Sequence, residues 1–190
     1  MRVARCPVAI GIIPLMNPRA LKSAAIAACV ALLACSPAMD WREVRPSGTR
    51  LLAMFPCKAV ASQRSVQLAG RAVLLSLHAC AAGDRTWGIA DADVLDPSLL
   101  RAAMKELLAA AVANIGAQSP QVQPLQVPGA TPHEASSRAL LTGARPDGQP
   151  VEMALAVFAD GTRVFQATLL GRRATGDDAV SFFASLRVAP

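Results

Sequence analysis

A single change of hydrophobic period constrains the fold of this chain more than any other feature. Between residues 97 and 115, apolar side chains recur at the spacing of one helical face, at Leu100, Met104, Leu107, Leu108, Ala111 and Ile115. This pattern predicts an amphipathic helix whose apolar stripe packs on a sheet. Asp96 is placed to cap the helix, Pro97 suits its first turn and Gly116 favours its end.

Short apolar segments between turn residues predict β-strands on both sides of this helix. Strands are expected at residues 50–55, 65–68, 71–81, 86–94, 134–144, 151–159 and 162–170. Ala69-Gly70 and the Asp-Gly pairs at 147–148 and 160–161 predict tight hairpins. The proline-rich residues 117–133 are expected to form a connecting loop, with at most a short extended piece.

A short final helix is expected over residues 177–186. Strands joined by tight hairpins form an antiparallel sheet, and helices must then cover a face of it. The sequence therefore predicts an α+β domain, in which an antiparallel sheet of two hairpin blocks is covered by one long and one short C-terminal helix.

Three short segments carry a resemblance to a known fold. They are "FPCKA" at 55–59, "SFFASLRV" at 181–188 and the opening Asp40-Trp41-Arg42-Glu43-Val44. With two hairpin blocks around one long helix, residues 40–188 resemble the PsbP-like and DcrB-like fold and small proteobacterial lipoproteins. The resemblance implies an α+β sandwich, and it brings no catalytic motif with it.

The first 34 residues have the layout of a secretory signal peptide. Arg19 and Lys22 precede an uncharged apolar run from Ala24 to Ala34, and small residues surround Cys35. A run of this length is about half of the roughly 20 residues that a transmembrane helix needs. Export is therefore favoured over a permanent membrane span.

Leu32, Leu33, Ala34 and Cys35 resemble the lipobox of bacterial lipoproteins. In that class the cysteine thiol receives diacylglycerol and a dedicated peptidase, which recognises the three preceding residues, cuts before it. The resemblance implies that Cys35 is the first residue of a lipid-anchored protein. With Ser36 next to it, the resemblance also implies the outer membrane, facing the periplasm.

Two alternatives concern this leader. Ordinary cleavage after Ala38 would instead release an unlipidated periplasmic protein, although it would leave Cys35 without a role. A second apolar patch, from Val8 to Leu15, precedes the leader, and a start at Met16 would give a leader of ordinary proportions. We expect Met16 to be the true start.

The charge of the chain lies largely in this leader. The formal net charge is +6, and residues 1–34 hold four basic and no acidic side chains. The remaining 156 residues carry 15 basic and 13 acidic side chains, which argues against a nucleic-acid-binding surface. We expect a signal peptide at 1–34, a lipidated tether at 35–48 and a single domain at 49–190.

Cys57 and Cys80 are the two cysteines that remain in the expected domain. Exported proteins meet an oxidising compartment, so these two are expected to form a disulfide. A redox role is the more specific alternative hypothesis, but the sequence has no CxxC spacing.

Few other residues suggest chemistry. Ser76, His78 and Cys80 alternate along one strand and could outline a metal or nucleophile site, although no second pair has ligand spacing. Asp91 and Asp93 could begin a cation site, but a solvated strand end is the expected reading. His133 is expected at the surface and Trp87 in the core or lining a groove. No catalytic residue, metal or cofactor is predicted.

Three classes of function remain open. The first is a non-catalytic binding or accessory lipoprotein that contacts an envelope protein. The second is a small-molecule or lipid carrier with a groove between helix 97–115 and the sheet. The third is an enzyme, which the absence of a catalytic motif disfavours.

Overall fold

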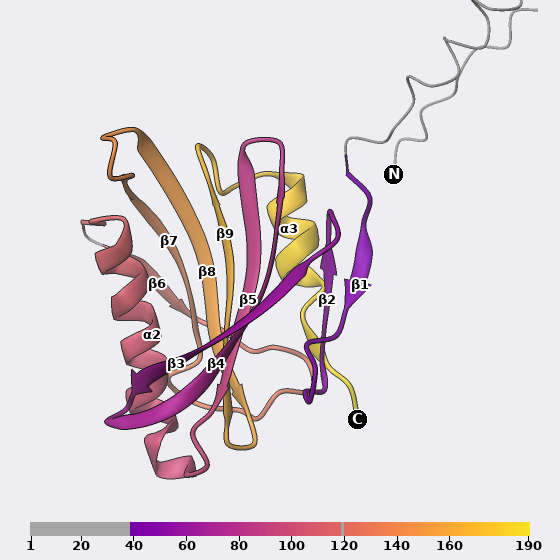
Figure 1. Ribbon diagram of the computed structural model, residues 1–190, viewed down its shortest axis with the longest axis vertical. Coiled ribbons are helices and arrows are strands. Elements are labelled where there is room, and N and C mark those ends of the chain that lie inside the picture. Colours follow the sequence, from indigo (N-terminus) through magenta and orange to yellow (C-terminus); the bar gives the residue numbers. More distant parts are fainter. Residues whose placement is uncertain (1–38, 119) are drawn as a thin grey trace, which may run out of the picture. The chain divides into compact units, whose positions relative to one another are not determined.

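The computed structural model describes residues 39–118 and 120–190, and they form two antiparallel sheets and two α-helices (Figure 1). The larger sheet has seven strands in the order β3-β4-β5-β9-β8-β7-β6, and the smaller has three in the order β1-β2-β10. The strands are β1 (Arg42–Val44), β2 (Leu51–Phe55), β3 (Val60–Leu68), β4 (Arg71–Ala82), β5 (Arg85–Asp93), β6 (Gln121–Pro124), β7 (Ser137–Ala144), β8 (Pro150–Asp160), β9 (Arg163–Gly171) and β10 (Arg187–Val188). The helices are α2 (Leu100–Asn114), which follows the 3-10 turn η2 (Pro97–Leu99), and α3 (Asp177–Ala184).

The two helices lie on opposite faces of the seven-stranded sheet (Figure 1). Side chains of a strand point alternately to its two faces, and β8 shows the consequence. Leu155 and Val157 pack in the core under α2, whereas Ala156 and Phe158 pack in the core under α3 and β2. Each face of the sheet therefore has its own apolar core.

The helix predicted from the change of period is confirmed. Met104 and Ala103 of α2 are fully buried, and Leu100, Leu107, Ala111 and Ile115 are nearly so. The Asp96 side chain accepts a hydrogen bond from the Ser98 backbone N–H at 2.9 Å and caps the turn before the helix.

The predicted hairpins are also present. β3 and β4 pair from Leu68 opposite Arg71 outward, around Ala69 and Gly70 with φ angles of 51° and 74°. Two positive φ angles define a type I′ turn, whose twist matches that of the strands. The Asp160-Gly161 turn likewise connects β8 to β9.

The predicted α+β sandwich is wrong, because the fold is mainly β: 48% of it is strand and 17% helix. The two hairpin blocks join through the pairing of β5 with β9 into one continuous sheet. The second sheet, β1-β2-β10, shares one face of the seven-stranded sheet with α3, and α2 lies on the opposite face, so the two helices do not cover the same face together. Strand content was underestimated because β1, β6, β10 and the first half of β3 are short or polar and lack an alternating pattern.

The boundaries of the expected parts also change. β1 lies inside the range 35–48 expected to be a tether, and it pairs with β2 through Val44 opposite Ala53. Met39 and Trp41 pack against the core on the same side. The folded unit therefore begins well before residue 49. In the stretch expected to be a loop, residues 121–124 form β6 and pair with β7.

None of the helices among the described residues is long and apolar enough to cross a membrane.

Candidate functional site

The residues predicted to carry the lipid lie outside the described part of the chain. These are Cys35 and the peptidase recognition residues Leu32, Leu33 and Ala34, together with Met16 and the alternative cleavage site at Ala38. Their roles stay predictions from the sequence.

Cys57 and Cys80, which the sequence predicts to pair, form a disulfide with their Cα atoms 5.9 Å apart. Cys57 follows the end of β2 by two residues, and Cys80 lies on β4. The bond therefore links the small sheet to the large one at the edge of the core that contains Trp87. Trp87 itself is fully buried, which confirms its expected place in a core.

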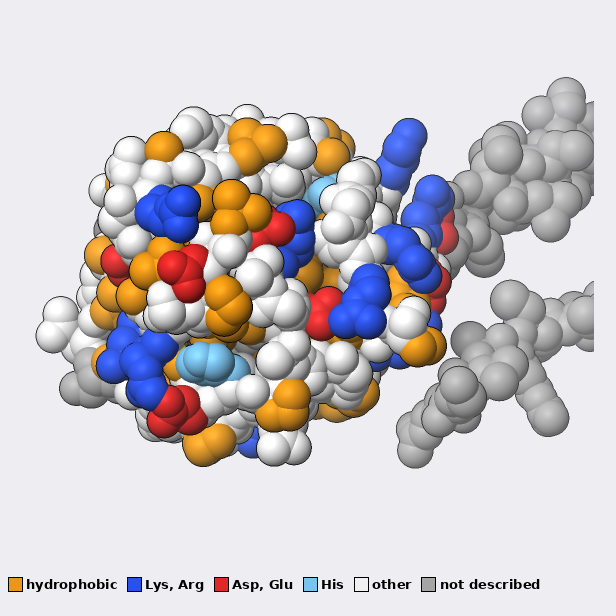
Figure 2. Space-filling model, turned by 90° about the horizontal axis from the view of Figure 1, so that it is seen from below, with side chains coloured by type: hydrophobic (Ala, Val, Ile, Leu, Met, Phe, Trp, Pro, Cys, Tyr) orange, Lys and Arg blue, Asp and Glu red, His pale blue; other side chains and the backbone are white. Residues whose placement is uncertain are grey.

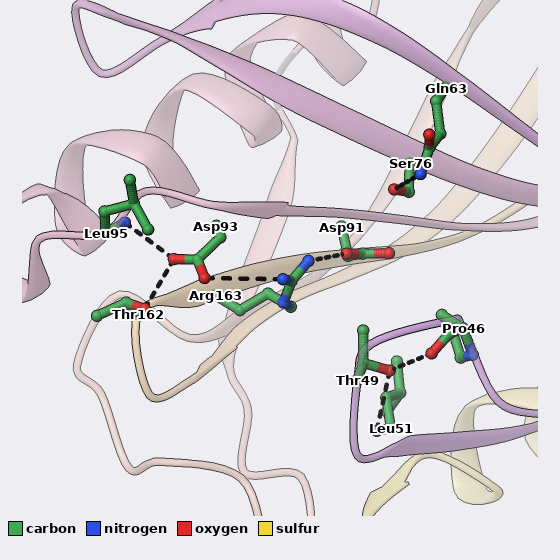
Figure 3. Close-up of polar contacts among 10 residues, drawn as sticks. All are labelled: Pro46, Thr49, Leu51, Gln63, Ser76, Asp91, Asp93, Leu95, Thr162 and Arg163. Carbon is green, nitrogen blue, oxygen red and sulfur yellow. Dashed lines mark hydrogen bonds and ion pairs between the residues drawn. The ribbon is translucent and has the colours of Figure 1, made fainter.

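A row of polar side chains runs across the large sheet on the face that carries α3. Gln63, Ser76 and Asp91 are register neighbours on β3, β4 and β5. The Gln63 Nε2 donates a hydrogen bond to the Ser76 Oγ at 3.0 Å, and Figure 3 shows the pair above the strand that carries Asp91. The row ends at Arg163 of β9, whose Nη1 donates to the Asp91 Oδ2 at 2.5 Å.

The two aspartates of β5 differ in environment although both face Arg163 (Figure 3). The Asp91 side chain is completely buried, and burial raises its pKa against the opposing effects of Arg163 and His78. Asp93 is more exposed, and the hydrogen bond that the Thr162 hydroxyl donates to it at 2.7 Å is the main cause of its lowered pKa. The expected solvated strand end is therefore wrong for Asp91.

This polar row does not assemble a catalytic relay. Ser76, His78 and Cys80 share a strand face as expected, but among the described residues no hydrogen bond joins Ser76 to His78 or His78 to Asp91. A nucleophile needs such a contact with its base. The buried Nδ1 of His78, Oδ1 of Asp91 and Nε1 of Trp87 instead have no hydrogen-bond partner among residues 39–118 and 120–190.

Metal-ligating side chains do not gather in the part of the chain that the structure describes. Residues 39–118 and 120–190 contain no group of three or more His, Cys, Asp or Glu side chains that could hold a metal ion. His133 is half-buried, and its Nδ1 accepts a hydrogen bond from the Ala135 N–H at 3.0 Å. It lines a cavity of about 390 Å³ formed mainly by the loop before β7.

A hollow lined mainly by apolar side chains lies between α3 and the strands β6, β7 and β8, and we call it the α3 groove. It has a volume of about 550 Å³. Its floor consists of neighbouring residues of the sheet and its wall of one side of α3. The lining residues used below are Leu140, Ala154 and Ala156 of the floor, Val180 and Phe183 of the wall, and Gln123 and Arg138 of the rim.

Side-chain size explains why this groove stays open. Leu140, Ala154 and Leu169 are successive register neighbours, as are Arg138, Ala156 and Ala167. Ala154 and Ala156 therefore lie on β8, between β7 and β9. Their small side chains leave open the space that α3 does not fill. On the next row of the same face, Phe158 and Phe165 stack at 5.2 Å and close the core.

The groove lies on the face opposite to the one that the sequence indicated. The middle of the interface between helix 97–115 and the sheet, where the sequence indicated a groove, is filled by Met104, Ala103 and the aliphatic side chains of β8 and β9. A hollow borders only the end of this helix, at Asn114 and Ile115. The sequence contained one usable signal for the true groove, the alternation of alanine at 154 and 156 with larger residues along β8.

The rim of the α3 groove has exposed apolar side chains and one positively charged side chain, Arg138. Val180 is 66% exposed and Leu140 37%. Arg138 donates two hydrogen bonds to the Gln123 Oε1, at 3.0 and 2.8 Å, and forms no ion pair within the described residues. The arrangement can hold an apolar body while leaving a guanidinium available at its edge.

Comparison with known proteins gives no family for this chain. No protein-family model matches it, and no curated protein sequence is significantly similar to it.

Proposed function

We propose that this protein is a lipid-anchored binding protein of the bacterial cell envelope, and that its folded unit holds a small amphiphile in the α3 groove without acting on it chemically. The observation that carries the ligand proposal is the groove itself. A volume of about 550 Å³ falls within the roughly 300–1,000 Å³ of small-molecule sites, which are mostly apolar with few polar groups.

The anchoring part of the proposal rests on the sequence. The lipobox-like Leu32-Leu33-Ala34-Cys35 follows a charged and then an apolar segment. Diacylglycerol on Cys35 gives two acyl chains, and two chains anchor a protein stably where one does not. The predicted destination is the outer membrane, facing the periplasm.

The chemistry of the lining indicates the class of ligand. Alanine and leucine side chains, with Val180 and Phe183, form most of the lining of the α3 groove, and they favour an acyl chain. Arg138 at the rim favours a carboxylate or phosphate, which it can bind through two parallel N–H donors. The best match is therefore a single-chain amphiphile with an anionic head group.

Binding of 11-(dansylamino)undecanoic acid to the full chain tests the ligand proposal. Dansyl fluorescence is expected to rise on binding, and Ala154→Phe is expected to abolish the rise because it fills the floor of the groove. Ala81→Phe is the matched control, since Ala81 is also a strand alanine but lies exposed outside the groove. Equal binding by the two variants would overturn the proposal.

The role of the rim cation has its own test. Arg138→Gln is expected to weaken binding of the anionic probe about tenfold, and to leave binding of the corresponding neutral methyl ester unchanged. A loss of affinity that is the same for acid and ester would contradict a head-group contact.

Lipidation is tested by mass spectrometry of the mature N-terminus and by detergent partitioning. The wild type is expected in the detergent phase with a modified Cys35, and Cys35→Ser in the aqueous phase or unprocessed. An unmodified N-terminus after residue 38 would favour the secreted alternative.

A further inference from the structure

β3 is a long edge strand of the seven-stranded sheet, and Arg64 is the one charged residue along it. It is nine residues long and pairs with β4 at nine consecutive positions without a bulge. It contains no proline, and its residues 60–65 are all exposed. The other edge, β6, has only four residues and ends at Pro124. Proteins normally shorten, bend or charge such edges, because an open edge templates another strand.

The type I′ turn fixes which backbone groups of β3 are free. In a two-residue hairpin the pair that flanks the turn, here Leu68 and Arg71, exchanges both backbone hydrogen bonds. Alternate residues then point their N–H and C=O groups to the partner strand. The groups of Ala61, Gln63 and Ser65 therefore point away from β4, towards the open edge.

The edge is held in place at its end. Glu106 of α2 accepts a hydrogen bond from the Ala69 N–H at 2.7 Å, and Leu68 is buried in the core under α2. Figure 1 shows the hairpin crossing the front of the molecule with β3 outermost. An incoming strand would thus meet a preorganised ladder, which lowers the entropic cost of binding.

The side chains beside this edge are basic and apolar. Residues 57–83 contain Lys58, Arg64 and Arg71 and no Asp or Glu. Lys58 and Arg64 form no ion pair with the described residues. Val60 on β3 and Leu77 on β4 are 71% and 38% exposed.

We propose that β3 is a docking edge for an extended acidic segment of a partner protein, which adds to the sheet as an eighth strand beside β3. Main-chain bonds to Ala61, Gln63 and Ser65 supply affinity, and alternate side chains supply specificity. An acidic side chain lies opposite Arg64, and apolar side chains lie opposite Val60 and Val66, which share its face of the strand. This surface is separate from the α3 groove and does not depend on the function proposed for it.

Charge argues against a second copy of the chain as the occupant. The free edge allows two-fold antiparallel pairing centred on any residue from 61 to 65, because hydrogen-bonded and non-hydrogen-bonded pairs alternate along the ladder. Centring on Arg64 places it opposite Arg64 of the other copy, and centring on Gln63 or Ser65 places the two diagonally. Centring on Ala61 or Ser62 brings Arg64 opposite or diagonal to Lys58. Like charges at such positions are destabilising.

Two synthetic peptides on the full chain test the proposal. The peptide Val-Thr-Glu-Thr-Thr-Thr-Val places its glutamate opposite Arg64 in antiparallel pairing, and the reversed sequence does so in parallel pairing. One of them is expected to slow amide hydrogen exchange at Ala61, Gln63 and Ser65. The same peptide with lysine in place of glutamate is expected to bind several-fold more weakly.

Ser65→Pro removes an outward N–H without removing a bond to β4, and proline is tolerated at such edge positions. It is expected to abolish binding, whereas Ser65→Ala retains it, and circular dichroism checks that both variants fold. Failure of both peptides to bind, or equal binding by the glutamate and lysine forms, would overturn the proposal. So would a dimer in sedimentation experiments that Ser65→Pro abolishes, because a second copy would then be the occupant.

Discussion

The two faces of the seven-stranded sheet are closed in different ways. The α2 face is covered by one helix of 15 residues, whose buried side chains are aliphatic and alanine. The α3 face is covered by a helix of eight residues and a three-stranded sheet, and it holds all the buried aromatic side chains, the disulfide and the buried Asp91. The first face is a mainly apolar interface, whereas the second combines several different elements and leaves the α3 groove between them.

This difference indicates where a ligand-binding site can form on the sheet. A surface that one long helix fills has no room for a ligand, as the packing around Met104 shows. A surface assembled from several short elements has gaps between them. Figure 2, which views the molecule from below, shows charged side chains of both signs interspersed with apolar ones, so no single-sign patch marks a site on that surface.

The largest effect is expected from removing the aromatic centre of the α3 face. Phe182 is fully buried and packs edge-on against Phe55 at 5.5 Å. Phe182→Ala is expected to lower the free energy of unfolding by about 3–5 kcal/mol and to weaken probe binding in the α3 groove. Urea denaturation and dansyl fluorescence measure the two effects.

Met104→Ala is the matched change on the other face, where Met104 is also fully buried. It is expected to cost about 2–5 kcal/mol but to leave binding in the groove intact. If Met104→Ala weakened binding as much as Phe182→Ala, the two faces would not be independent.

The disulfide is expected to have the next largest effect. Cys57 and Cys80 are separated by 23 residues in sequence, and a loop of that size corresponds to about 3 kcal/mol in the chain-entropy model. The double variant Cys57→Ser, Cys80→Ser is expected to show this loss in denaturation experiments. If the oxidised wild type and the double variant were equally stable, packing alone would hold the small sheet against β4.

A smaller effect concerns pH, and the two aspartates of β5 are expected to act in opposite directions. Burial raises the pKa of Asp91, so its contribution to stability is present below the unfolded value of about 3.9 and is lost as pH rises through the folded value. Asp93 has a lowered pKa, so its contribution is present at higher pH and is lost as pH falls below about 4.

Ionisation of Asp91 is expected to lower the free energy of unfolding as pH rises from 3 to 7, and Asp91→Asn should remove this decrease. Ionisation of Asp93 is expected to raise the free energy of unfolding over the same range, and Asp93→Asn should remove this increase. Urea midpoints measured from pH 3 to 7 check both variants. Equal pH profiles for the two would contradict the assignment of opposite environments to the carboxylates beside Arg163.

The smallest effect is expected at the ion pairs that flank the two helices. Arg101 of α2 pairs with Glu134 at the surface, and Arg85 pairs with Asp178 of α3 at 3.1 Å in a more buried setting. Arg101→Gln is expected to change stability by less than about 1 kcal/mol, and Arg85→Gln by more than Arg101→Gln. Thermal unfolding of the two variants ranks them, and the reverse order would contradict the ranking by burial.

Local patterns predicted local structure well. The helix with Leu100 and Met104 on its stripe, the turn at Ala69-Gly70 and the Asp-Gly hairpins were all correct, because a few neighbouring residues determine them. The disulfide could be predicted because the leader predicts export, cysteines of exported proteins tend to pair, and only Cys57 and Cys80 remained in the expected domain. The fold class was wrong because β1 and β10 are two or three residues long and form only when β2 lies between them.

The candidate sites depended on partners distant in sequence. Nothing near Asp91 in the sequence indicates that Arg163, 72 residues away, lies beside it. The groove was expected under the wrong helix, because its existence depends on the side-chain volume at Ala154 and Ala156 relative to the reach of α3. The free edge of β3 depends on the order of strands in the finished sheet.

The place of β2 between β1 and β10 has a consequence for the order of folding. β2 ends at residue 55, whereas its partner β10 begins at residue 187. β1 and β2 are close in sequence and can pair early, but the small sheet is complete only when β10 has been synthesised and has reached β2. Until then the side chains of Phe55 and Leu51 lack part of their cover, so the partly folded chain exposes apolar surface that favours aggregation.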